Sequence, residues 1–234
     1  MLHSIKKQAG FTLVELLVVL TVFGILTLAV FTIFINQFIS ITRSDSEARL
    51  TVESQLLVRD VVERLRDGYG SISLSQSEVS GSGVTDPYKP AAGWVTSNAL
   101  LRIIVNTPAQ DSANNFIIDD LTGDPYLDEQ IYFADATNRI LYRRTLKNTN
   151  ASGSTTVQTC PKPNASPSCP ADAVLTEHFQ SMIFTLYDQD NTVTLVPELA
   201  RSVLIEVTLN RGASGNDDVE ITNKIRITLR NKKA

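Results

Sequence analysis

A long apolar run near the start of the chain constrains its fold more than any other feature. Residues 11–35 read FTLVELLVVLTVFGILTLAVFTIFI and contain one ionisable side chain, Glu15. Because about 20 mostly apolar residues span a bilayer as a helix, this segment is predicted to enter a membrane. Lys6 and Lys7 precede it and Arg43 is the first basic residue after it. The positive-inside bias therefore places the N-terminus in the cytoplasm and the bulk of the chain across the membrane.

The charged residues lie almost entirely beyond this run. All but three of the 21 basic and 25 acidic side chains follow Thr42, which leaves 19 basic and 24 acidic groups in that part and a net charge of −5. A nucleic-acid-binding domain needs a concentrated basic face, so no nucleic-acid partner is predicted. Two histidines and two cysteines offer little material for a transition-metal site or a histidine-based catalytic centre. We expect neither a cofactor, nor a metal, nor catalytic residues.

Small residues stand before the apolar run rather than after it. In an ordinary secretory signal a small-residue cleavage site follows the apolar region, which is then discarded. Here Ala9 and Gly10 lie between the basic leader and Phe11. A cut after Gly10 would remove only the leader and leave the apolar segment as the start of the mature chain.

Glu15 has two interpretations. A carboxylate in hydrocarbon is costly and tends to mark a function. The sequence Thr12-x-x-Glu15 fits a helix-capping box, in which the glutamate bonds a free backbone N–H at the helix start. Alternatively, processing creates a cationic amino group on Phe11, which neutralises Glu15 of a neighbouring subunit inside a bundle of apolar helices. The second interpretation favours an assembled filament over a lone monomer.

The segment KKQAGFTLVELLVVLTVFGIL, residues 6–26, resembles the class III signal of type IV prepilins and type II secretion pseudopilins. A basic leader, Gly10, Phe11, Glu15 at the fifth mature position and an unbroken apolar run coincide in it. The resemblance implies cleavage after Gly10 and N-methylation of Phe11 by a prepilin peptidase/methyltransferase. It also implies assembly with other pilin or pseudopilin subunits through an inner-membrane platform. The chain is then expected in the inner membrane first, and afterwards in an extracellular pilus or a periplasmic pseudopilus.

The helix is predicted to continue beyond the membrane. Residues 43–67 contain no Gly or Pro, and four apolar residues recur on one helical face: Leu50, Leu57, Val61 and Leu65. This face should pack on the rest of the chain, and Gly68 is expected to end the helix. The predicted organisation is a cleaved leader (1–10), a transmembrane and filament-core helix (11–39), its amphipathic continuation (40–67) and an exported β-rich head (68–234).

The head reads as a series of strands. A Gly/Ser-rich connector is predicted at 68–83, with a short alternating strand within it at 71–75. Beyond it, short apolar or alternating stretches are predicted as strands at 100–105, 116–118, 130–134, 139–145, 182–187, 192–196, 203–209 and 225–229. The predicted fold class is α+β, with one long N-terminal helix packed on an antiparallel sheet.

The phrases MIFTLYDQDN, ARSVLIEVTL and IRITLRN in the last third resemble large minor pilins and J-class minor pseudopilins. This resemblance implies a subunit that initiates or caps a filament at its tip. The alternative is a membrane-anchored surface-binding module, either an adhesin or a DNA-uptake tip. An enzyme is not predicted, because no constellation of catalytic residues is present.

The remaining candidate residues favour structural roles. Cys160 and Cys169 enclose a Pro-rich stretch, and an exported compartment favours a disulfide between them over a metal site. His178 is expected as an exposed residue at a strand edge, and residues 188–191 as a turn rather than a calcium loop. Five acidic residues are expected as solvated loop carboxylates, with calcium binding as the alternative: Asp119, Asp120, Asp124, Asp128 and Glu129.

Overall fold

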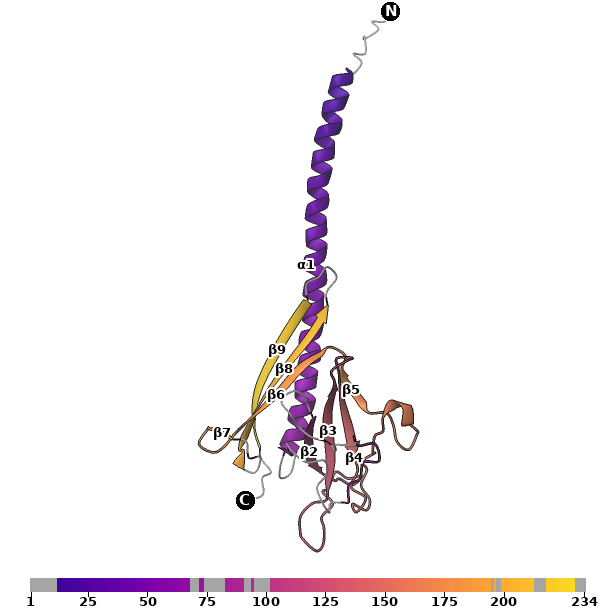
Figure 1. Cartoon of the computed structure of the whole chain (residues 1–234), viewed down its shortest axis with the longest axis vertical. Coiled ribbons are helices and arrows are strands. Elements are labelled where there is room, and N and C mark those ends of the chain that lie inside the picture. The colour runs from indigo at the N-terminus through magenta and orange to yellow at the C-terminus, as the bar shows by residue number, and fades with distance from the viewer. Residues whose placement is uncertain are drawn as a thin grey trace, which may run out of the picture.

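The computed structural model describes residues 12–67, 72–73, 83–90, 94, 102–194, 196, 199–212 and 218–229. In this part of the chain one long helix projects from a head built of two antiparallel β-sheets (Figure 1). The predicted α+β fold with a long N-terminal helix is therefore confirmed. Most of the predicted connector at 68–83 lies outside the described residues, as do Gly68, Gly10 and Phe11.

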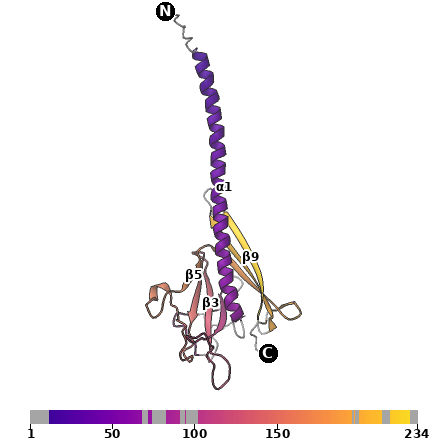
Figure 2. The same ribbon diagram turned by 180° about the vertical axis from the view of Figure 1, so that it is seen from behind.

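Helix α1 spans Leu13–Asp67 and is 55 residues long. Its first half stands clear of the head, and its second half lies between the two sheets (Figures 1 and 2). The division follows the sequence, because apolar residues surround the first half and form a single stripe on the second. The predicted inner face is confirmed: Leu50, Leu57, Val61 and Leu65 are each at most 2% exposed.

The first sheet has five strands in the order β1-β2-β3-β4-β5, and all neighbouring strands are antiparallel. The strands are β1 (Ile72–Ser73), β2 (Arg102–Pro108), β3 (Leu127–Asp135), β4 (Ile140–Leu146) and β5 (Ala173–Thr176). A 3-10 turn, η1 (Lys162–Asn164), lies in the connection between β4 and β5.

The second sheet has four strands in the order β7-β6-β8-β9, again antiparallel throughout. It consists of β6 (Phe179–Tyr187), β7 (Val193–Thr194), β8 (Ser202–Gly212) and β9 (Asp218–Thr228). The two sheets flank α1 on opposite sides, which both views show (Figures 1 and 2).

One hydrophobic core joins the helix to both sheets. It contains the inner face of α1, Ile103, Val105, Tyr132 and Leu141 of the first sheet, and the inward side chains of β6, β8 and β9. The opposite face of the first sheet carries a smaller core of Val84, Trp94, Ile104, Ile131 and Leu146. Both faces of this sheet are therefore covered, which explains why β3 has a nearly continuous buried run rather than a simple alternation.

Several strand predictions need correction. Residues 116–118 are not a strand; Phe116 and Ile118 make only isolated bridges, to Gln110 and Pro125. Strand β5 was not predicted at all, because its four residues are too few to establish an alternating pattern. The division of the strands over two sheets was also not predicted, since the same alternation fits either arrangement.

Candidate functional site

The start of α1 carries a capping box formed by two residues. The backbone N–H of Thr12 and its hydroxyl donate to the Glu15 carboxylate at 2.9 and 3.0 Å, and the N–H of Glu15 donates to the Thr12 hydroxyl at 3.3 Å. These reciprocal bonds satisfy backbone donors that the helix itself leaves unpaired. In the single chain Glu15 therefore caps the helix, whereas its proposed partner Phe11 lies outside the described residues.

The exposed half of α1 has the length and composition of a membrane span, and none of its apolar window is buried against the head. Its hydroxyl groups bond within the helix: Thr21 donates to the carbonyl of Val18, and Thr27 to that of Phe23, at 2.9 and 2.8 Å. Such bonding removes the cost of placing a free hydroxyl in hydrocarbon. This half of the helix therefore presents no unsatisfied threonine hydroxyl to a lipid or to a neighbouring apolar helix.

The head holds α1 through a polar cluster as well as through its core. Asp60 of α1 forms an ion pair with Arg143 of β4 and accepts a hydrogen bond from the Tyr132 hydroxyl at 3.1 Å. Burial, followed by the charge of Asp60, raises the pKa of Tyr132, which keeps its hydroxyl protonated as a donor. Asp60 was not singled out from the sequence. Its position among Leu57, Val58, Val61 and Val62 was the signal for an inward carboxylate.

His178 makes a second polar contact between α1 and the head. It lies between the ends of β5 and β6, and its Nδ1 is 3.1 Å from the Glu53 carboxylate on α1. Both side chains are 27% exposed. The expectation of an exposed strand-edge histidine was wrong. His178 lies where the chain passes from the first sheet to the second, and α1 packs beside this connection.

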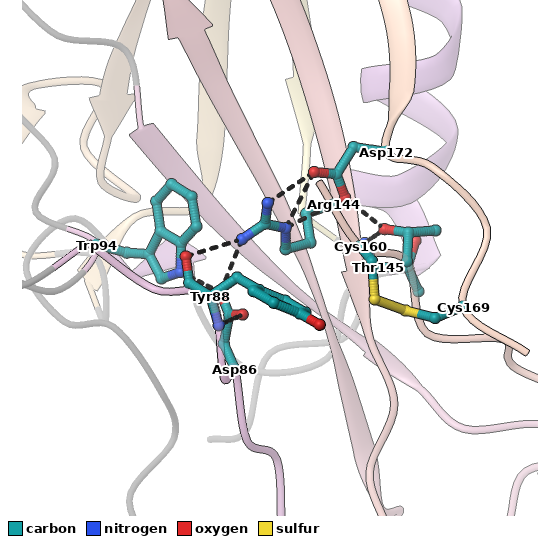
Figure 3. A network of polar contacts seen from close by, with 9 residues as sticks. Asp86, Tyr88, Trp94, Arg144, Thr145, Cys160, Cys169 and Asp172 are labelled. Carbon is teal, nitrogen blue, oxygen red and sulfur yellow. Dashed lines mark hydrogen bonds and ion pairs between the residues drawn. A yellow bond between two sulfur atoms is a disulfide. The ribbon is translucent and has the colours of Figure 1, made fainter. Parts of the chain in front are cut away.

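A buried network around Arg144 joins three segments of the head (Figure 3). The Arg144 guanidinium lies between Asp172, at 2.7 Å, and Asp86, at 3.1 Å. All three side chains are at most 5% exposed. Asp86 also accepts a hydrogen bond from the Trp94 indole at 2.8 Å, and Asp172 one from the Thr159 hydroxyl at 2.8 Å. The network therefore fixes Asp86, Trp94 and the connection before β5 on the outer face of β4.

This network was missed in the sequence because its members lie far apart in the chain. The only signals were Arg144 in a predicted strand and the single tryptophan, Trp94, beyond the Gly/Ser-rich connector. Neither signal identifies the partner carboxylates, which the fold alone brings together.

The disulfide joins Cys160 to Cys169 beside this network. The enclosed residues form a compact loop: the N–H of Ser166 donates to the carbonyl of Cys169, and the N–H of Cys160 to that of Pro170, both at 2.8 Å. The N–H of Asp172 in turn donates to the carbonyl of Cys160 at 2.8 Å. The disulfide loop therefore sets the position of the Asp172 carboxylate that Arg144 binds.

The acidic residues do not come together as one group. Asp119, Asp120 and Asp124 lie in the loop between β2 and β3, whereas Asp128 and Glu129 lie in β3 and are at most 1% exposed. The expectation of solvated carboxylates was therefore wrong for the last two. In the part of the chain that the structure describes, no three His, Cys, Asp or Glu side chains are arranged to hold a metal ion.

Asp128 borders a polar hollow of about 290 Å³, which is lined by Arg64, Thr107, Pro108, Gln110, Gln130, Thr145, Thr155, Thr156 and Val157. Its carboxylate accepts hydrogen bonds from the N–H of Asn148 at 2.7 Å and the hydroxyl of Thr156 at 2.6 Å. Burial nevertheless raises the pKa of Asp128.

Residues 188–191 form the predicted turn, in which the Asp188 carboxylate accepts hydrogen bonds from the N–H groups of Asp190 and Thr192, both at 2.9 Å.

Comparison with known proteins gives one family match. Residues 5–31 match the model described as the prokaryotic N-terminal methylation motif. No curated protein and no solved structure matches the chain significantly. The matched residues include the leader junction, Glu15 and the first part of the apolar helix, so the chain carries the N-terminal region of a type IV prepilin-like protein. This motif supports a pilin-type subunit that is processed by a prepilin peptidase, anchored in a membrane by its apolar helix and assembled with other pilins.

Proposed function

We propose that the chain is a minor pilin or pseudopilin of a type IV pilus or a type II secretion-like filament, and that it initiates or caps the filament at its tip. The observation that carries the proposal is the methylation motif at residues 5–31, whose described part from Leu13 onward belongs to a helix with an apolar first half that is clear of the head. A helix of this kind is suited to leave the bilayer for a bundle of similar helices, because both environments are apolar.

Maturation is the first step of the proposed function. Cleavage after Gly10 exposes the amino group of Phe11, which is then N-methylated and remains cationic. Among the described residues the Glu15 carboxylate bonds Thr12, three residues away, and these two bonds leave it lone pairs for a further donor. We propose that in the filament it binds the Phe11 amine of a neighbouring subunit.

A tip position is supported by the size and shape of the head. Two sheets flank α1 on opposite sides (Figures 1 and 2), so the head extends laterally on both sides of the helix. Such a head is easier to accommodate at the end of a filament than in a shaft, where each helix has neighbours on every side.

Mass spectrometry and fractionation test this proposal together. The intact mass of the membrane-extracted protein should correspond to a chain that starts at a methylated Phe11. In cells the mature chain should be recovered with sheared filaments at a small fraction of the major subunit, and immunogold labelling should mark filament ends. A mature species that retains Lys6 and Lys7 would contradict the processing, and uniform labelling along the shaft would contradict the tip position.

The alternative role as a surface-binding module has one observation in its favour. A folded loop between β2 and β3 carries exposed apolar side chains at the end of the head. The two roles are compatible, because a tip subunit can also bind a partner.

A further inference from the structure

Residues 109–126, which we call the distal loop, join β2 to β3. The loop lies at the end of the head farthest from the free half of α1 (Figure 1), and the reverse view places it at the same end (Figure 2). With α1 in a membrane or a filament, the distal loop is the part of the described head that points farthest away from it.

The distal loop is held in one conformation by its own hydrogen bonds. Its base is closed by backbone bonds of 2.8 to 3.0 Å among Ala109, Ile117 and Tyr126. At its tip the N–H of Asp119 donates to the carbonyl of Asp124 at 2.8 Å, and the Asp119 carboxylate accepts the N–H of Leu121 at 2.9 Å. Gly123 has a φ of 73°, which glycine adopts without strain. A loop ordered in this way loses little conformational entropy when it binds a partner.

Three large apolar side chains of this ordered loop are exposed to water. Leu121 is 95% exposed, Phe116 51% and Ile118 45%. Phe116 and Ile118 are two residues apart in an extended segment, so their side chains project to the same side. Exposed apolar groups within six consecutive residues of a well-ordered loop are typical of a binding surface, because neither folding nor solubility requires them there.

The charge of the loop restricts the kind of partner. It carries four aspartates and no Lys or Arg: Asp111, Asp119, Asp120 and Asp124. Hydrogen bonds from Asn115 hold the pKa of Asp111 below its usual range, which keeps this carboxyl ionised. An anionic loop is repelled by nucleic acid and by an anionic bilayer surface. It is attracted to a protein surface with basic residues at its rim.

We infer that the distal loop inserts Phe116, Ile118 and Leu121 into an apolar pocket of a partner protein, and that Lys and Arg side chains border this pocket. The apolar side chains provide the anchors, and the aspartates around them orient the loop and exclude proteins without a basic rim. The inference goes beyond the proposed function and does not depend on it, since it concerns only the head.

Site-specific photocrosslinking of the full chain in cells tests the inference. The variant Leu121→p-benzoylphenylalanine places the probe at the most exposed anchor. The variant Thr137→p-benzoylphenylalanine is the matched control, because Thr137 is also exposed but lies in the turn between β3 and β4. Adducts are identified by mass spectrometry, and recovery of each variant with filaments is measured in the same cells.

We expect a discrete protein adduct from position 121 and none of that mass from position 137. The crosslinked partner peptide should be apolar and flanked by Lys or Arg. Adding Phe116→Ser, which removes an anchor, should lower the adduct yield about tenfold, and Asp120→Lys should lower it as well. A lipid or nucleic-acid adduct, the same adducts from both positions, or no adduct from position 121 would overturn the inference, whether or not the chain is recovered with filaments. Loss of the filament association alone would instead contradict the proposed function.

Discussion

The buried Arg144 network allows a quantitative test of how the head is held together. The perturbation is Arg144→Met, which keeps an unbranched stem similar to that of arginine and removes the guanidinium with its charge. In the wild type the guanidinium donates to Asp172 at 2.7, 3.1 and 3.2 Å and to Asp86 at 3.1 Å. The variant leaves two carboxylates, each at most 5% exposed, without their cation. Removal of one partner from a buried ion pair costs about 3 to 5 kcal/mol.

The chain offers a matched control for this substitution. Arg59→Met makes the same chemical change on α1, where Arg59 pairs with Glu63 at 2.7 Å but is 74% exposed. An exposed pair of this kind contributes little to stability, so the control should unfold at the same denaturant concentration as the wild type.

The assay is urea unfolding of the full chain in detergent. It is followed by circular dichroism and by the fluorescence of Trp94, the single tryptophan. Because the Trp94 indole bonds Asp86, its emission reports the network itself, whereas circular dichroism reports the secondary structure of the whole chain. Adding Asp172→Asn to Arg144→Met removes one unpaired charge and should restore part of the lost stability. If Arg144→Met costs no more than Arg59→Met, or if the second substitution lowers stability further, the electrostatic explanation is refuted.

Three further experiments test the remaining contacts of the head. Leu57→Ala should lower the free energy of unfolding by about 2 to 5 kcal/mol. In the same urea assay Leu56→Ala, at a neighbouring residue that is 62% exposed, should have almost no effect. Equal effects of the two substitutions would contradict the docking of α1 between the sheets. Replacing Cys160 and Cys169 by Ser should cost about 2 to 3 kcal/mol, and quantitative alkylation of both thiols without reductant in the wild type would contradict the disulfide. Burial raises the pKa of Asp128 above its value in the unfolded chain, which is about 3.9. The protonated carboxyl therefore contributes stability at lower pH, and this contribution is lost as the pH rises through the folded pKa. Asp128→Asn should therefore gain stability relative to the wild type between pH 4 and pH 7, and a difference that is constant with pH would refute this assignment.

The helix was predictable because its signals are local. The apolar run at 11–35 lies within one segment and predicts the membrane half. Residues 43–67, which contain no Gly or Pro, carry the stripe of Leu50, Leu57, Val61 and Leu65 that predicts the docking face. Strands β3, β4, β6 and β8 were also found, because alternation or an apolar run extends over several residues. The ends of these strands were missed by up to a few residues, since pairing with a neighbour rather than side-chain pattern decides where a strand ends.

The parts that were not predictable depend on contacts between distant segments. Asp60 meets Arg143 from 83 residues away, and His178 meets Glu53 from 125 residues away. A charged residue on a helix and a histidine in a strand connection are each typical of a solvated surface when considered alone. Only the position of α1 between the sheets makes them polar contacts within the fold. Similarly, residues 116–118 of the distal loop were predicted as a strand because they form a short apolar stretch, whereas in the fold Phe116 and Ile118 are exposed in a loop.

The claim that most needs testing is that Glu15 acts in assembly and not only as the helix cap seen with Thr12. The measurement is the recovery of Glu15→Gln with sheared filaments, together with its level in the membrane. Glu47→Gln, an exposed position paired with Arg43 on the amphipathic half, is the control. Glutamine also serves in a capping box, so helix capping and membrane insertion should remain intact. We expect normal membrane levels of both variants and loss of filament recovery for Glu15→Gln alone, because the Phe11 amine of the neighbour loses its anion. Normal filament recovery of Glu15→Gln would contradict the account and leave Glu15 as a helix cap.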